Sequence, residues 1–65
     1  MAQQEIYNIM KKNPKLWFNL SQLSKMTGVN NKSTSRALIR RLKYNEVEAI
    51  RRIVDGKSIL FYKLK

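Results

Sequence analysis

The hydrophobic pattern changes after Asn45 from a period of about 3.6 residues to a period of 2, and this change constrains the fold most strongly. Residues 47–54 and 57–64 are rich in β-branched and aromatic side chains. Asp55 and Gly56 separate these two runs. An Asp-Gly pair between two strand-like segments is typical of a two-residue hairpin turn. The sequence therefore predicts a β-hairpin at the C-terminal end of the chain.

The Asp-Gly turn also fixes which residues of the two strands pair. It places Val47 opposite Leu64 and Ile50 opposite Phe61. The face expected to pack against the rest of the domain carries Val47, Ala49, Ile53, Leu60, Tyr62 and Leu64. The other face is mixed in polarity and carries Glu48, Ile50, Arg52, Ile59, Phe61 and Lys63.

The segment before the hairpin predicts three helices and one short strand. The helices are expected at residues 2–12, 20–27 and 31–44, and the strand at residues 16–18. Asn13 and Pro14 end the first helix. Asn19 and Gln22 have the spacing of a capping box at the start of the second helix, and Gly28 supplies the left-handed residue that ends it. The elements together predict an α+β domain.

The third predicted helix has two different faces. Its apolar stripe contains Leu38, Ile39 and Leu42, with the small Ser35 one turn earlier, and we expect this stripe in the core. Asn30 or Asn31 is the expected N-cap. The opposite face carries small polar, basic and aromatic residues: Ser33, Arg36, Ala37, Arg40 and Tyr44.

Positive charge dominates this chain of 65 residues, which we expect to form a single domain over residues 1–65. The chain has 14 Lys and Arg against 4 Asp and Glu, a net charge of +10. No acidic residue lies between Ile6 and Asn45, whereas nine Lys or Arg fall there. A domain this basic repels itself unless something anionic neutralises it. Nucleic acid is the first candidate partner, and anionic lipid or an acidic protein tail is the second.

Missing residue types exclude several kinds of chemistry. Cys and His are absent, which removes disulfides, zinc fingers, thiol nucleophiles and histidine acid–base catalysis. We therefore expect no enzyme activity, no cofactor and no metal site. No apolar run approaches the roughly 20 residues of a membrane span, and the chain shows no secretory leader. These features predict a cytoplasmic, nucleoid-associated protein that binds no membrane.

The predicted helix–turn–helix points to double-stranded DNA. Two helices joined by a short turn at Gly28 can place the second of them in a major groove. Arg36 and Arg40 carry fork-shaped donors that match guanine O6 and N7, and the small Ser33 and Ala37 allow a close approach to base edges. The candidate contacts from this helix and the turn before it are Asn30, Asn31, Lys32, Ser33, Arg36, Ala37, Arg40, Arg41, Lys43 and Tyr44.

Basic residues at the margins of this surface are expected to contact the DNA backbone. In the third helix these are Lys32, Arg41 and Lys43. The second helix adds Ser21 and Lys25. The hairpin adds three cations that can reach the backbone or a neighbouring minor groove: Arg51, Arg52 and Lys57.

Three segments of the chain carry a family resemblance. Residues 19–29 (NLSQLSKMTGV) resemble the second helix and turn of MarR-like and ArsR-like regulators. Residues 32–38 (KSTSRAL) with Leu42 resemble their recognition helix, and residues 61–64 (FYKL) resemble their closing wing strand. The resemblance implies a winged helix–turn–helix fold, DNA binding and transcriptional regulation. The chain lacks the extra helices of MarR-type dimers and the Cys or His of ArsR-type metal sensors, so the resemblance implies no ligand.

Other interpretations stay open at the level of sequence. The domain could be a protein–protein adaptor, or a nucleoid-type protein that coats DNA without sequence preference. An exposed row of arginines is also common on ordinary solvated helices, although the lack of acids across this region argues against that reading. Ile50, Ile59 and Phe61 on the outer hairpin face predict a weak homodimer, or a monomer that pairs on DNA.

Overall fold

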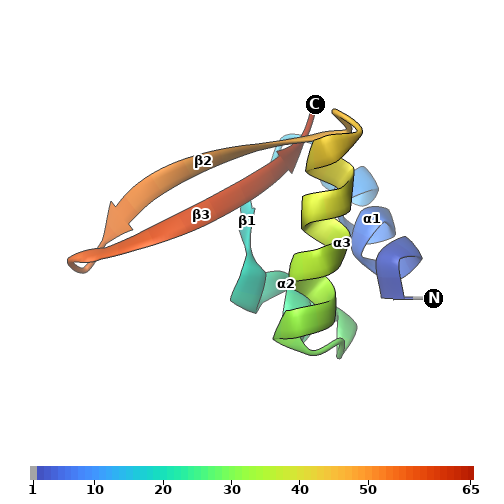
Figure 1. The fold of residues 1–65 in the computed structure, drawn as a ribbon, viewed down its shortest axis with the longest axis horizontal. Helices are drawn as coiled ribbons and strands as arrows, with labels where there is room; N and C mark the ends of the chain where they lie inside the picture. Colours follow the sequence, from blue (N-terminus) through green and yellow to red (C-terminus); the bar gives the residue numbers. More distant parts are fainter. Residues whose placement is uncertain (1) are drawn as a thin grey trace.

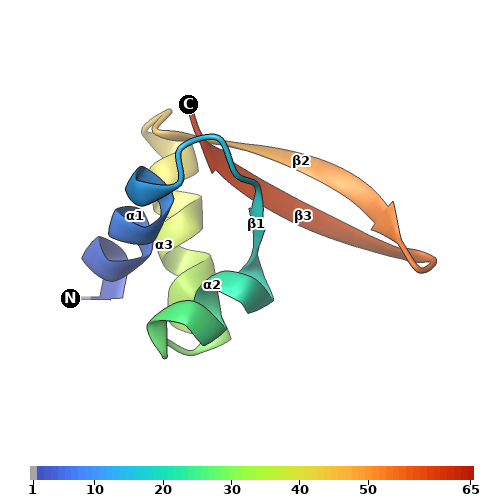
Figure 2. The same cartoon turned by 180° about the vertical axis from the view of Figure 1, so that it is seen from behind.

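The computed structural model describes the backbone of residues 2–65 and the side chains of residues 5–65. Its helices are α1 (Ala2–Lys12), α2 (Leu20–Thr27) and α3 (Asn31–Lys43). Its strands are β1 (Phe18–Asn19), β2 (Val47–Val54) and β3 (Lys57–Leu64), in one antiparallel sheet of order β1-β3-β2. The helices form one body, and the β2–β3 hairpin extends from it as a wing (Figures 1 and 2). The fold is an α+β winged helix–turn–helix.

The predicted element bounds are confirmed with two small differences. The bounds of α1, α2, β2 and β3 agree with the prediction, and α3 ends one residue earlier. The short strand β1 lies at Phe18–Asn19 instead of residues 16–18. The reason is its pairing, because Phe18 and Asn19 are the residues that lie opposite Tyr62 and Phe61 of β3.

Side-chain and backbone caps set the limits of α2 and the start of α3. The Asn19 side chain accepts a hydrogen bond from the Gln22 backbone N–H at 2.8 Å, and the Gln22 side chain accepts one from the Asn19 N–H at 2.9 Å. This confirms the predicted capping box. Gly28 ends α2 with φ of 74°, in the left-handed region. Asn30 caps α3 by accepting from the Ser33 N–H at 2.8 Å.

The end of α3 leads directly into the wing. Tyr44 is the C-cap, and Asn45 follows it with φ of 64°. The Glu46 N–H donates to the Arg41 carbonyl at 2.9 Å, and the Asn45 N–H donates to the Leu42 carbonyl at 3.0 Å. These two bonds form a Schellman motif, in which asparagine takes the left-handed position more often held by glycine. The motif lets β2 begin within three residues of the helix.

The hydrophobic core lies between the three helices and the base of the wing. Its buried members are Ile6, Met10, Phe18, Leu23, Ala37, Leu38, Val47 and Tyr62. Ile9, Leu20, Leu42, Ala49 and Leu64 pack against this cluster and are partly buried. Trp17 is half-buried, and the Lys63 ammonium lies 4.9 Å from the centroid of its ring. The helices therefore enclose one core that the wing closes on one side.

The wing has the predicted register, but the core covers only its base. Every pair from Val47↔Leu64 to Val54↔Lys57 is as the Asp-Gly turn requires. On the face predicted to be buried, Val47 and Tyr62 are buried, whereas Ile53 is 71% exposed and Leu60 is 37% exposed. Placing Ile53 and Leu60 in the core is therefore wrong, because the wing extends beyond the helices that could cover them (Figure 1).

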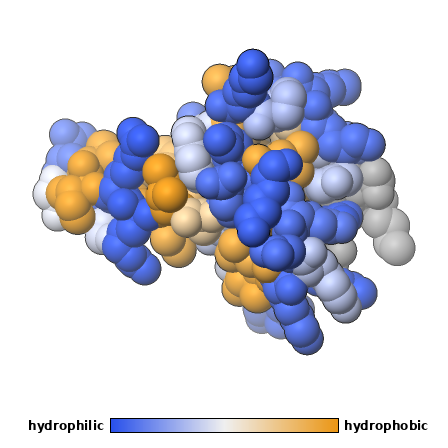
Figure 3. All heavy atoms as spheres, turned by 90° about the horizontal axis from the view of Figure 1, so that it is seen from above, coloured by the Kyte–Doolittle hydropathy of each residue, from blue (hydrophilic) through white to orange (hydrophobic). Residues whose placement is uncertain are grey.

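Apolar residues gather toward the free end of the wing. Figure 3 shows apolar and polar spheres alternating along the wing, with apolar spheres near the tip.

Within residues 2–65, no helix is long and apolar enough to cross a membrane.

Candidate nucleic-acid interface

Hydrogen bonds hold the turn between α2 and α3 in one shape. The Gly28 N–H donates to the Ser24 carbonyl at 2.9 Å, and the Ser24 hydroxyl donates to the Val29 carbonyl. The Thr27 hydroxyl donates to the Leu23 carbonyl at 2.8 Å and accepts from the Val29 N–H at 3.1 Å. These bonds satisfy polar groups of the turn's backbone and stabilise the direction in which α3 leaves α2.

The inner face of α3 is built from small residues and leucines. Thr34, Ala37 and Leu38 are buried, with at most 1% of each exposed, and Leu42 packs beside them. The Thr34 hydroxyl donates to the Asn30 carbonyl at 2.9 Å, so this buried polar group has a partner. This face packs against α1 and α2.

Two predictions about the faces of α3 are wrong. Ala37 was expected on the outer face and is 1% exposed, so its side chain cannot reach a base edge. Ile39 was expected in the core and is 59% exposed. The buried stripe is rotated relative to the predicted one, because Thr34 and Ala37 allow α3 to approach its neighbours closely. Successive residues are about 100° apart on a helix, so burying Ala37 and Leu38 turns Ile39 outward.

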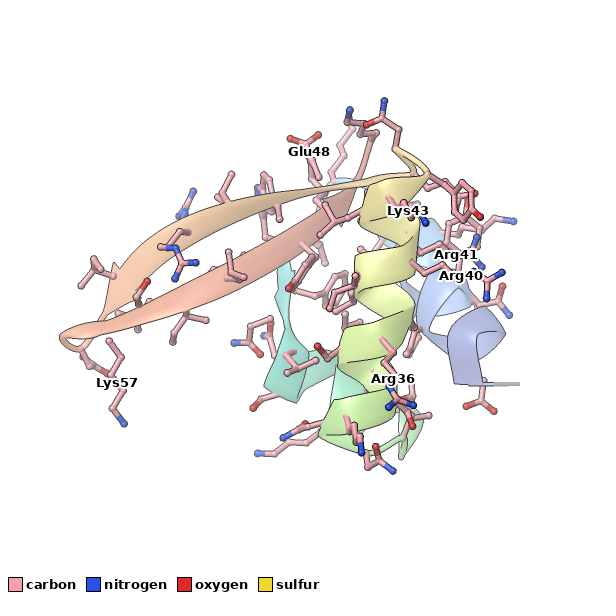
Figure 4. All side chains as sticks on the ribbon, in the orientation of Figure 1. Arg36, Arg40, Arg41, Lys43, Glu48 and Lys57 are labelled. Carbon is pink, nitrogen blue, oxygen red and sulfur yellow. The ribbon has the colours of Figure 1, made fainter. Side chains whose placement is uncertain are left out.

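The outer face of α3 is basic. Lys32, Arg36, Arg40 and Lys43 are exposed, and Tyr44 at the helix end is 61% exposed. Arg36, Arg40 and Lys43 come from successive turns of α3 (Figure 4). A shallow groove on this face is lined by Arg36, Ile39, Arg40, Lys43 and Tyr44. Four of the predicted contact residues thus lie along one side of α3, at Lys32, Arg36, Arg40 and Lys43.

Arg41 does not belong to this outer face. Its Nη1 lies 2.6 Å from Glu46 Oε2, and 22% of its side chain is exposed. The guanidinium carbon also lies 4.2 Å from the centroid of the Tyr7 ring. The predicted phosphate contact of Arg41 stays a prediction, and Arg41 differs from the exposed cations because its charge is held between α1 and the start of the wing. Its neighbour Arg40, one position earlier, points to solvent.

The remaining predicted residues surround the outer face of α3. Ser21 and Lys25 of α2 are exposed, in the first and last turns of that helix. Asn30, Asn31 and Lys32 are exposed at the start of α3, and Ser33 is half-buried. The Asn30 side-chain oxygen is engaged as the helix cap.

The wing carries its three cations in exposed positions. Arg51, Arg52 and Lys57 are all exposed, and Lys57 lies at the wing tip (Figure 4). Arg51 and Arg52 point to opposite faces, because side chains alternate along a strand. Arg51 donates to the Ser58 hydroxyl at 2.9 Å.

A second groove lies between α3 and the wing. It is lined in part by Ser21 of α2, Ser35 of α3, and Arg51 and Ser58 of the wing. The sequence reading missed Ser35 as a surface residue because it placed this side chain on the buried stripe. The rotation of α3 that exposes Ile39 also turns Ser35 toward this groove.

The exposed cations of α3 have no acidic partner in the part of the chain whose side chains are described. Among residues 5–65, the only ion pair joins Arg41 and Glu46. Asp55 lies at the far end of the wing, and Glu48 lies on β2 near its base (Figure 4). The described part of the interface therefore has an unbalanced positive charge, which attracts polyanions at long range.

Two solved structures share this fold. A possible transcriptional regulator from Methanosarcina mazei Go1 aligns with a TM-score of 0.92 and 17% identity over 98% of this chain. The chain spans 54% of that protein, about half of its length. Stf76 from the Sulfolobus islandicus plasmid-virus pSSVx aligns with a TM-score of 0.84 and 17% identity, over 98% of this chain and 80% of Stf76. No protein-family model and no curated protein matches the sequence. The narrower likeness to MarR-like and ArsR-like regulators stays a prediction.

Proposed function

We propose that this chain is a double-stranded DNA-binding protein that regulates transcription, with α3 in the major groove and the wing on the adjacent backbone or minor groove. One observation carries the proposal: the outer face of α3 presents Lys32, Arg36, Arg40 and Lys43 to solvent, and within residues 5–65 none of them is paired with a carboxylate. An α-helix with exposed arginines fits the width of the major groove and matches the acceptors of guanine.

The spacing of the arginines suits successive base pairs. Arg36 and Arg40 are four residues apart, which is about 6 Å along the helix axis. Neighbouring base pairs are separated by about 3.4 Å, so the two guanidinium groups can address bases about two steps apart. Lys32 and Lys43 lie toward the two ends of the helix, where the phosphate backbones border the groove.

The wing and α2 extend the same basic surface. Arg51, Arg52 and Lys57 are proposed to contact the backbone or the adjacent minor groove, and Ser21 and Lys25 to contact phosphates. The description of the Methanosarcina protein as a possible transcriptional regulator supports the regulatory part of the proposal. That description belongs to a protein about twice as long. Regulation of transcription by this chain is therefore our proposal and is not taken over from that description.

The test is a selection of duplexes from a random library at about 150 mM salt, followed by affinity measurement on the preferred and on random DNA. We expect a preferred sequence bound at least 10³-fold more tightly than random DNA, the low end for specific DNA-binding proteins. Arg36→Ala and Arg40→Ala should weaken binding to the preferred sequence most. Lys12→Ala is the matched control, because it removes one exposed positive charge from α1.

Each alternative function has its own outcome in this experiment. Tight binding to all duplexes without a preferred sequence would indicate a nucleoid-type protein. No measurable binding to any duplex would contradict the proposal and favour a protein–protein adaptor.

The homodimer through Ile50, Ile59 and Phe61 stays a prediction. All three side chains are half-buried on the face of the wing away from the core. We keep it as part of the proposal because two domains on a palindromic site double the number of base contacts. A cytoplasmic, nucleoid-associated location is likewise a proposal that follows from DNA binding.

A further inference from the structure

Ile39 lies beside the exposed cations on the basic outer face of α3. It is 59% exposed and lines the shallow groove together with Arg36, Arg40, Lys43 and Tyr44. An exposed apolar side chain is common on protein surfaces. What distinguishes Ile39 is its setting, because three exposed cations line the same groove, and none of them forms an ion pair among residues 5–65.

The helical spacing places Ile39 between Arg36 and Lys43 along the axis of α3. It follows Arg36 by three residues and precedes Lys43 by four, so the three side chains lie one above another on successive turns. Arg36 and Lys43 are about 10 Å apart along the axis, which corresponds to about three base-pair steps. A duplex whose major groove receives this part of α3 therefore brings base edges close to Ile39.

Charge limits the partners that can cover this residue. A second copy of this chain carries a net charge of +10, so docking it on the same face would place like charges together. A polyanion is attracted instead. Within the major groove, each base edge offers hydrogen-bond donors or acceptors, and thymine also offers an apolar methyl group at C5. Isoleucine has no donor or acceptor, so the thymine methyl is the group that matches it.

We infer that Ile39 contacts the C5-methyl group of a thymine and is a specificity-determining residue of the interface. This inference rests on the proposed DNA binding. It adds that the middle of α3 selects a thymine. Because Arg36 and Arg40 line the same groove as Ile39 and match guanine, the preferred site should contain a thymine within about two base pairs of a guanine.

The test removes the methyl group without changing base pairing. Each thymine of the selected duplex is replaced in turn by deoxyuridine, and the dissociation constant is measured by fluorescence anisotropy at about 150 mM salt. Burying one methyl-sized group contributes enough free energy for about a fourfold change in affinity. We expect about a fourfold loss at one thymine for the unmodified protein.

A double-mutant cycle links that loss to Ile39. In Ile39→Ser, the same thymine-to-deoxyuridine change should have no effect, because no apolar side chain remains to contact the methyl group. Leu16→Ser is the matched control. Leu16 is 54% exposed, and its loop between α1 and β1 lies on the side seen in Figure 2, away from α3. This control should keep the full fourfold loss.

The outcomes separate this inference from the function on which it rests. Failure to bind any duplex overturns both. Sequence-preferring binding with no sensitivity to any thymine-to-deoxyuridine change overturns the role of Ile39 alone. An equal fourfold loss in the unmodified protein and in Ile39→Ser also overturns it, because another residue would then contact the methyl group. Circular dichroism of both variants checks that they are folded.

Discussion

Arg40 and Arg41 are adjacent in the sequence, yet their substitution by alanine should have opposite effects. Arg40 points to solvent on the proposed DNA face, whereas Arg41 lies between Tyr7 and Glu46. We expect Arg41→Ala to lower the free energy of unfolding and to leave the DNA affinity of the folded protein nearly unchanged. We expect Arg40→Ala to do the reverse.

The size of the Arg41 effect follows from its contacts. The partly exposed ion pair with Glu46 contributes about 0.5–1 kcal/mol, and the stacking on Tyr7 contributes about 1 kcal/mol. Loss of the covered methylene stem adds about 1 kcal/mol. The Arg41 Nε is buried without a partner, so removing it returns about 1 kcal/mol. The net loss is about 2 kcal/mol, out of about 3–10 kcal/mol for a domain of this size.

Thermal unfolding followed by circular dichroism measures this loss. For a domain of this length, about 2 kcal/mol lowers Tm by about 8–16 °C. Arg40→Ala should change the free energy of unfolding by less than about 0.5 kcal/mol. On the preferred duplex, Arg40→Ala should lose about 1–3 kcal/mol of binding free energy. Arg41→Ala should lower the affinity for the same duplex at most about threefold. If Arg41→Ala kept its Tm and lost as much affinity as Arg40→Ala, the assignment of Arg41 to the fold would be refuted.

Three further predictions concern binding. The logarithm of the affinity should fall with the logarithm of salt concentration with a slope of about −4 to −5, because about five cations reach phosphates: Lys25, Lys32, Lys43, Arg52 and Lys57. A slope shallower than about −2 would contradict the phosphate contacts. Arg36→Ala should cost about 1–3 kcal/mol on the preferred duplex and less on random DNA, whereas Lys57→Ala should weaken both equally. Equal losses for both variants on both DNAs would mean that α3 does not read bases. Phe61→Lys should abolish cooperative binding to a probe with two half-sites while keeping one-site affinity, and unfolding of this variant would instead place Phe61 in the core.

Local signals made most of the fold predictable from the sequence. The Asp-Gly turn set the register of the whole wing, and Asn19, Gln22 and Gly28 set the limits of α2. Each of these signals acts through residues that are two to four positions apart, so no tertiary contact is needed to read it. The role of Arg41 had no such signal. Its stacking partner Tyr7 lies in a different helix, and only the packing of α1 on α3 brings the two side chains together.

The rotation of α3 could not be predicted because two stripes on this helix were plausible, and the choice between them depends on its neighbours. The predicted stripe, with Ile39, is the more hydrophobic one. The observed stripe, with Thr34 and Ala37, is smaller, so α3 packs more closely on α1 and α2 while the Thr34 hydroxyl keeps a backbone partner. Close packing therefore prevailed over burial of the larger side chain. The same rotation places Ile39 beside the unpaired cations. The expectation that the most hydrophobic stripe is buried therefore failed on the helix that carries the proposed function, and such failures are expected at functional sites.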